Sequence, residues 1–95
     1  MTLARIVGRV VCSRRADGIS GAVWRLVEIC DTAGNPDGDI IVALDLVGSE
    51  YDDVVLLCSG SSVRWTRQTI DKPVDTLIVG LVEMIDEKGV FTYRR

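Results

Sequence analysis

Residues 58–67 combine the side chains of this sequence that are best suited to chemistry, in the order CSGSSVRWTR. Three serines surround one glycine, and two arginines flank a tryptophan. Such a segment could hold a serine nucleophile in a tight turn, bind an anion through backbone amides, bind a nucleic acid, or begin a helix. The rest of the chain must supply the partners that each of these four interpretations needs.

The nucleophile interpretation lacks its partners. A nucleophilic serine needs a G-x-S-x-G turn and a histidine, whereas this segment lacks the second glycine and the chain contains no histidine. The two lysines, Lys72 and Lys88, both lie in turn-like positions, which disfavours a serine–lysine pair. Capping of a helix by Ser59, Ser61 or Ser62 is the simpler interpretation, because a serine hydroxyl accepts hydrogen bonds from first-turn amides.

Two binding interpretations remain as alternatives. A helix start at 60–64 could bind an anion, but the sequence has no phosphate-loop pattern and no dinucleotide pattern. Arg64, Trp65 and Arg67 join positive charge to a stacking surface, as single-strand binders do. The net charge of −3 and the five aromatic residues in the whole chain count against a nucleic-acid interface.

The cysteines and carboxylates predict neither a metal site nor a cofactor. Cys12, Cys30 and Cys58 stand apart without CxxC spacing. Their odd number, and an N-terminal segment unlike a signal peptide, predict a reduced, cytoplasmic setting without a membrane span.

The acidic residues divide into two groups. The pairs 37/39 and 52/53 are interpreted as solvated turn residues. Asp45, Asp75 and Asp86 lie in or beside apolar strands, where a carboxylate needs a partner, and we expect arginines of a neighbouring strand or subunit to provide one.

Alternating apolar residues and turn signals predict six strands in a single domain, residues 1–95. Turns are expected at 32–39 (TAGNPDGD, with NPDG at 35–38) and 87–89 (EKG), and a short helix at 61–70. The strands are expected at 2–13, 22–31, 40–48, 52–59, 74–86 and 90–95.

Short strands around one helix favour the all-β class, as a small five-stranded barrel of the OB type. The third, fourth and fifth predicted strands are apolar on both faces, and one helix cannot cover them. Because a large exposed apolar surface usually marks an interface, the composition predicts a homo-oligomer and leaves the number of subunits open.

Two long segments read DTAGNPDGDIIVALDLVGSEYDDVVLLCSGSSVRWT and KPVDTLIVGLVEMID. They carry A-x-D-x-x-G at 43–48, a G-S-S-A-R-like run at 60–64, P-V-D at 73–75 and Gly80. In this order, and over nearly the whole chain, the motifs resemble those of the EutN/CcmL family of bacterial microcompartment vertex proteins. Valine replaces the usual alanine at position 63, and Gly48, Ser49 and Glu50 replace a Gly-Ala-Gly loop.

The resemblance implies a non-enzymatic pentamer without cofactor that caps the vertices of a microcompartment shell in the cytoplasm, with hexameric shell proteins as partners. It implies that the loop Gly48, Ser49 and Glu50 faces the oligomer axis. Interface or structural roles are expected for Gly60, Ser61, Ser62, Arg64, Trp24 and Asp75. The candidate contacts to other shell proteins are Arg14, Arg15, Arg94 and Arg95, with solvated ends and turns as the equal alternative. An OB-type single-strand binder and a small ligand-binding barrel remain the alternative functions.

Overall fold

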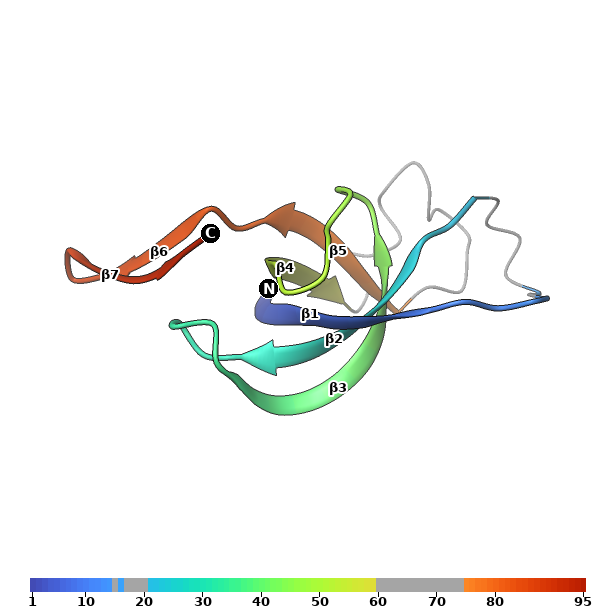
Figure 1. Cartoon of the computed structure of the whole chain (residues 1–95), viewed down its shortest axis with the longest axis horizontal. Helices are drawn as coiled ribbons and strands as arrows, with labels where there is room; N and C mark the ends of the chain where they lie inside the picture. Colours follow the sequence, from blue (N-terminus) through green and yellow to red (C-terminus); the bar gives the residue numbers. More distant parts are fainter. Residues whose placement is uncertain (15, 17–20, 60–74) are drawn as a thin grey trace.

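A computed structural model of the chain describes residues 1–14, 16, 21–59 and 75–95, and within these ranges all regular elements are β-strands (Figure 1). The predicted helix at 61–70 lies outside the described residues. The predicted ends of the first two strands run one to three residues too far. The strands are β1 Thr2–Val10, β2 Trp24–Cys30, β3 Pro36–Asp45, β4 Val54–Ser59, β5 Thr76–Leu81, β6 Met84–Glu87 and β7 Val90–Arg94.

Five of these strands close into a barrel in the order β1-β2-β3-β5-β4. Strand β1 pairs antiparallel with both β2 and β4, which joins the two edges of the sheet. Strand β4 pairs antiparallel with β5, and a short parallel contact between β3 and β5 completes the ring. The all-β class and the five-stranded barrel predicted from the sequence are therefore confirmed.

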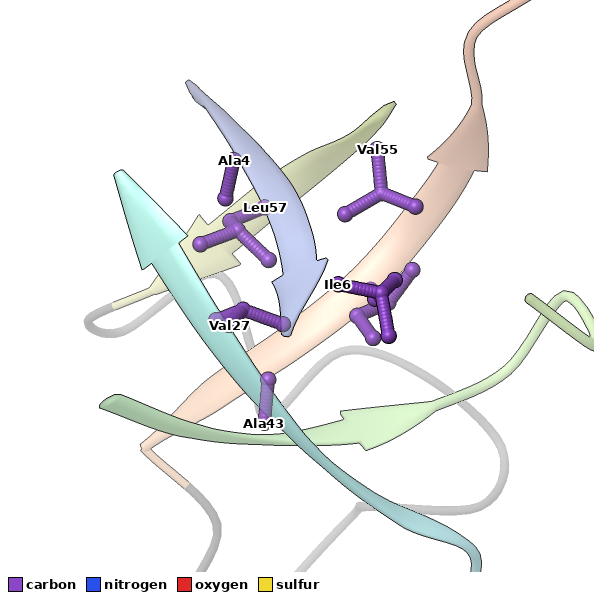
Figure 2. Packing of buried hydrophobic residues seen from close by; sticks show 7 residues of the cluster. Ala4, Ile6, Val27, Ala43, Val55 and Leu57 are labelled. Atoms are coloured by element: carbon purple, nitrogen blue, oxygen red, sulfur yellow. The ribbon is translucent and has the colours of Figure 1, made fainter. Parts of the chain in front are cut away.

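The barrel interior is filled by side chains from all five strands (Figure 2). They alternate with outward residues because successive side chains of a strand point to opposite faces. Ala4 and Ala43 are completely buried, and their small side chains leave room for the larger ones. The interior cluster consists of Ala4, Ile6, Val27, Ala43, Val55, Leu57 and Ile78.

A second cluster explains part of the apolar material on the other face of the strands. Leu44 of β3 and Leu77 of β5 are neighbours in the parallel pair and are almost completely buried. Trp24 and Val79 pack against them and are themselves half-buried. The barrel thus has a packed region outside its interior, at the β3–β5 pair.

The turn between β2 and β3 ends earlier in the chain than predicted. The sequence predicts a turn at 32–39, but β3 already begins at Pro36, which pairs with Cys30. A proline is tolerated as the first residue of a strand, and here the Asp31 carboxylate accepts hydrogen bonds from the amides of Ala33 and Asn35, both at 2.9 Å. The side chain of Asp31 therefore closes the turn at 31–35.

The predicted long strand at 74–86 is also wrong, because the chain leaves the barrel in its middle. Strand β4 begins at Val54, and the Val82 amide donates to the Val54 carbonyl at 2.9 Å as β5 ends. Beyond this point the chain has no further residue of β4 to pair with. Strand β6 pairs instead with β7, in a separate two-stranded sheet.

The β6–β7 hairpin turns at Lys88 and Gly89, as the sequence predicts. Both residues have positive φ, 52° and 84°, which suits a two-residue hairpin loop. Figure 1 shows the hairpin (red) projecting away from the barrel. Its base is held at the 31–35 turn, where the Thr92 hydroxyl donates to the Thr32 carbonyl at 2.6 Å.

Candidate assembly site

The loop between β3 and β4, residues 46–53, is held by the carboxylate of Asp45 at the end of β3. One oxygen accepts hydrogen bonds from the amides of Val47 and Gly48, each at 3.0 Å. The other accepts from the amide and the hydroxyl of Ser49, at 2.8 and 2.9 Å. One side chain therefore satisfies three successive loop amides and fixes the direction in which the loop leaves the strand.

Arg25 of β2 supplies the positive charge that balances Asp45. Its Nε lies 3.3 Å from the Asp45 carboxylate, and its Nη2 donates to the Ser49 carbonyl at 2.6 Å. Arg25 pairs with Ala43 in the sheet, two residues before Asp45, so the register of β2 and β3 places the guanidinium beside the loop. The prediction that Asp45 needs an arginine of a neighbouring strand is confirmed.

These contacts set the ionisation of Asp45. Burial is the largest single influence and raises its pKa, and its side chain is only 2% exposed. The hydrogen bonds from Val47, Ser49 and Arg25 together outweigh burial, so the pKa of Asp45 lies below its usual value. The carboxylate is thus charged at neutral pH and keeps the loop closed.

A second carboxylate, Asp53, holds the other end of the loop. Its Oδ2 accepts from the Glu50 amide at 2.9 Å, and its Oδ1 accepts from Arg95 Nε at 3.1 Å. The interpretation of Asp53 as a solvated turn residue is wrong, since Asp53 is 8% exposed. Sequence reasoning missed this contact because its partner, the last residue of the chain, lies 42 positions away.

The three predicted axis residues occupy different environments within this loop. Gly48 is exposed and has a φ of 75°, a conformation that favours glycine. Ser49 is completely buried, because it faces Asp45. Glu50 is exposed, and its backbone is fixed through Asp53. Of these three residues, therefore, the side chain of Glu50 and the backbone at Gly48 are available to a neighbour.

The outer surface of β2 and β3 is apolar and partly uncovered. Pairing places Leu26 opposite Val42, and Trp24 opposite Leu44, on the face turned away from the interior cluster. Ile40 and Val42 are 55% and 46% exposed. Of the predicted interface residues, Trp24 lies at the end of this surface, where it packs on Leu44.

The structure describes only some of the other predicted site residues. Gly60, Ser61, Ser62, Arg64 and Arg15 lie outside the described residues. Arg14 and Asp75 are exposed, the latter just before β5. Arg94 stacks on Phe91 with 4.2 Å between guanidinium carbon and ring centre, whereas Arg95 is paired with Asp53 and Glu83. The two C-terminal arginines are thus both engaged within the chain.

The described residues contain no candidate metal site. Histidine, cysteine, aspartate and glutamate side chains do not gather there into a group of three that could hold a metal ion. Cys12 and Cys30 are free thiols, and burial raises the pKa of Cys30 although Arg5 opposes the change. The described part of the chain also contains no helix long and apolar enough to cross a membrane.

Comparison with known sequences identifies related proteins over the whole chain. A family model described as ethanolamine utilisation protein EutN/carboxysome matches residues 1–83. The bacterial microcompartment shell vertex protein EutN of Escherichia coli K12 is 36% identical over 95 residues, which is all of both chains. The carboxysome shell vertex protein CcmL of Synechocystis sp. is 34% identical over all of this chain and 95% of its own.

Solved structures share the same barrel. CcmL of Gloeobacter violaceus superimposes with a TM-score of 0.92 at 29% identity, covering 100% of this chain and 98% of its own. A pentameric microcompartment shell protein, GrpN from Rhodospirillum rubrum, gives 0.81 at 28% identity and covers 92% of this chain and 99% of its own. Both similarities extend well beyond the five barrel strands.

Proposed function

The chain belongs to the EutN/carboxysome family, and from this membership we propose that it is a shell vertex protein, a structural subunit of a bacterial microcompartment in the cytoplasm. One observation carries the proposal: the chain aligns end to end with a vertex protein at 36% identity. The pentameric GrpN structure, built on the same barrel, supports a ring of five copies.

A closed ring requires two different surfaces on each subunit, because each copy meets its neighbours in head-to-tail fashion. The exposed apolar face of β2 and β3, with Ile40 and Val42, is one suitable surface. Burial of such apolar area is the main driving force for association. We assign Trp24, at the end of this face, to the subunit interface as well.

The loop carrying Gly48, Ser49 and Glu50 is proposed to face the axis of the ring. The hydrogen bonds that the carboxylates of Asp45 and Asp53 accept from loop amides give the loop a fixed shape. We call these two aspartates the latch carboxylates. A loop that is repeated five times around an axis requires such a fixed shape. The five copies of Glu50 would then form a ring of carboxylates at the axis. The negative charges of Asp45 and Asp53 would add little to this ring, because Arg25 and Arg95 balance them.

Hexameric shell proteins are the proposed partners of the outer rim. A pentamer supplies curvature where hexagonal tiles meet at a vertex, and its rim must contact those tiles. Arg14, which is exposed, and its neighbour Arg15 are the candidate contacts. The Gly60–Arg64 segment and Asp75 are proposed to support the interface between subunits.

The proposed role is non-enzymatic, as the names of the relatives indicate. The alternatives are less well supported. A ligand-binding barrel needs an open interior, whereas side chains fill the interior of this one (Figure 2). A single-strand binder needs a basic surface, and the chain carries a net charge of −3.

Electron microscopy of shells tests this function directly. Hexameric microcompartment shell proteins would be expressed with this chain and without it. We expect closed polyhedral shells only when the chain is present, with fivefold density at their vertices. Closed vertices in its absence, or density of another symmetry, would contradict the proposal.

A further inference from the structure

The β6–β7 hairpin has no barrel strand beside it in the described structure, although it forms a sheet of its own. An isolated two-stranded hairpin is at best marginally stable in water and needs a surface to pack on. One of its faces has such a surface. Tyr93 lies beside Gly34 of the 31–35 turn, Thr92 donates to Thr32, and Glu87 accepts from the Thr32 hydroxyl.

The opposite face of the hairpin exposes two large apolar side chains. Met84 pairs with Arg94 in the register of the two strands, and Arg94 stacks on Phe91. These three residues therefore share one face, the clasp face. Met84 and Phe91 are 53% and 51% exposed. The clasp face thus combines two large apolar side chains with two charged ones, Arg94 and the exposed carboxylate of Asp86, which pairs with Phe91 in the register.

The start of β3 has the complementary character. Ile40 and Val42 expose apolar surface, and Asp37 and Asp39 are exposed carboxylates in the same segment. The 31–35 turn contacts the hairpin and leads directly into β3, so both surfaces belong to one end of the barrel (Figure 1). Two different surfaces at the same level of the subunit can meet around a cyclic ring.

We infer that the clasp face of one copy packs on the start of β3 of the next copy in the ring. The occupant of each β3 surface is thus a second copy of this chain, with Arg94 near Asp37 and Asp39. The inference rests on the proposed pentamer. The contacts of Thr92 and Arg95 already hold the base of the hairpin in place. Little conformational entropy is therefore lost when the clasp face binds the next copy.

Cysteine cross-linking tests the contact between copies. In a background with Cys12, Cys30 and Cys58 replaced by serine, Phe91→Cys and Ile40→Cys would be placed on two differently tagged, co-expressed chains. A disulfide requires Cα atoms about 4.4–6.8 Å apart. We expect a cross-linked pair of unlike chains on oxidation. Val90→Cys, on the other face of β7, serves as control and should give none.

A second experiment needs no introduced cysteine. Phe91→Asp should raise the protein concentration at which the oligomer dissociates at least tenfold, whereas Val90→Asp should change it less than about twofold. Circular dichroism establishes that both variants keep the barrel. The variants differ by one position and by the face of β7 on which the charge stands.

The outcomes separate this inference from the proposed function. If the unmodified chain is itself a monomer, the vertex function fails. If the unmodified chain and Phe91→Asp form equally stable pentamers without cross-linking, only the clasp is overturned. If Phe91→Asp keeps its pentamer but no longer joins hexameric shell proteins, the hairpin serves another partner, and the clasp is likewise overturned.

Discussion

At the scale of single residues, Asp45 determines the shape of the 46–53 loop more directly than any other described side chain. It accepts hydrogen bonds from three loop amides and from Ser49 Oγ, and it pairs with Arg25. A buried group that loses such partners costs about 1–3 kcal/mol. The loop therefore depends on a residue that is itself hidden from any neighbour.

Replacing this carboxylate should destabilise the chain. We expect Asp45→Asn to lower the free energy of unfolding by about 2 kcal/mol, measured by urea denaturation. The matched control is Asp52→Asn, whose carboxylate pairs with Arg5 at 2.8 Å but is 65% exposed. Exposed pairs contribute about 0–1 kcal/mol. Equal effects of the two substitutions would contradict the assigned role of Asp45.

Asp45 also makes the free energy of unfolding depend on pH at acidic values. Because the pKa of Asp45 is lower in the folded chain than its ordinary value of 3.8, its contribution is complete above that pH and is lost as pH falls through the folded-state pKa. The difference in unfolding free energy between the unmodified chain and Asp45→Asn should narrow below about pH 3.8. A difference that stays constant down to pH 2 would refute this.

The two latch carboxylates show what sequence can predict at this scale. Asp45 stands in an apolar strand, which alone indicates that it needs a partner, and Arg25 on the adjacent strand is that partner. Asp53 stands beside another aspartate in a turn-like segment and resembles a solvated residue. Its burial depends on Arg95, which the fold brings back from the far end of the chain.

At the scale of elements, the 31–35 turn joins the barrel to the hairpin, and Gly34 is its most constrained position. Its φ is 81°, and a Cβ added there would lie 3.0 Å from Tyr93 Cδ1 and 3.2 Å from Val54 Cγ2. Gly21 has a similar φ of 69°, and no contact of the described residues is found within 4 Å of a Cβ added there. Comparing substitutions at the two glycines therefore distinguishes the effect of backbone strain from that of steric conflict.

Alanine at these two positions should have different effects. Gly21→Ala should lower the free energy of unfolding by about 1 kcal/mol through backbone strain alone. Gly34→Ala should lower it by at least about 2 kcal/mol, because steric conflict is added. Thermal or urea unfolding measures both. If Gly34→Ala were no worse than Gly21→Ala, the hairpin would not pack on the turn as described.

The boundaries of elements were harder to predict than their existence. The sequence signals at 35–38 are those of a turn, yet the Asp31 side chain closes the turn earlier and leaves Pro36 to begin β3. The apolar run at 74–86 has the pattern of one strand. It is divided because β5 runs antiparallel to β4 and reaches Val54, the first residue of β4, as it ends. The chain after this point therefore has no barrel residue of β4 to pair with. Both differences arise from contacts outside the segment concerned.

At the scale of the whole molecule, the apolar exterior of the strands is the feature that connects the fold to assembly. Packing around Leu44 and Leu77 covers part of it, and the β2–β3 exterior remains open. Sequence patterning predicted the barrel and the surplus of apolar surface, since both follow from alternation along the strands. It left the number of copies open, because that depends on the angle between subunits.

A charge on this exterior should weaken assembly. We expect Val42→Asp, at a side chain 46% exposed in the single chain, to lower the average solution mass at micromolar concentration while leaving the circular dichroism spectrum unchanged. Val90→Asp, which also exposes a charge at a valine, should leave the mass unchanged. An unchanged mass for Val42→Asp would move the interface away from β3.

The solution mass of the unmodified chain, measured by light scattering after size-exclusion chromatography, tests the central claim most directly. A ring of five copies predicts a mass five times that of the 10.4 kDa chain, stable on dilution through the micromolar range. A mass equal to one chain would contradict the vertex function, since a single barrel cannot close a fivefold opening.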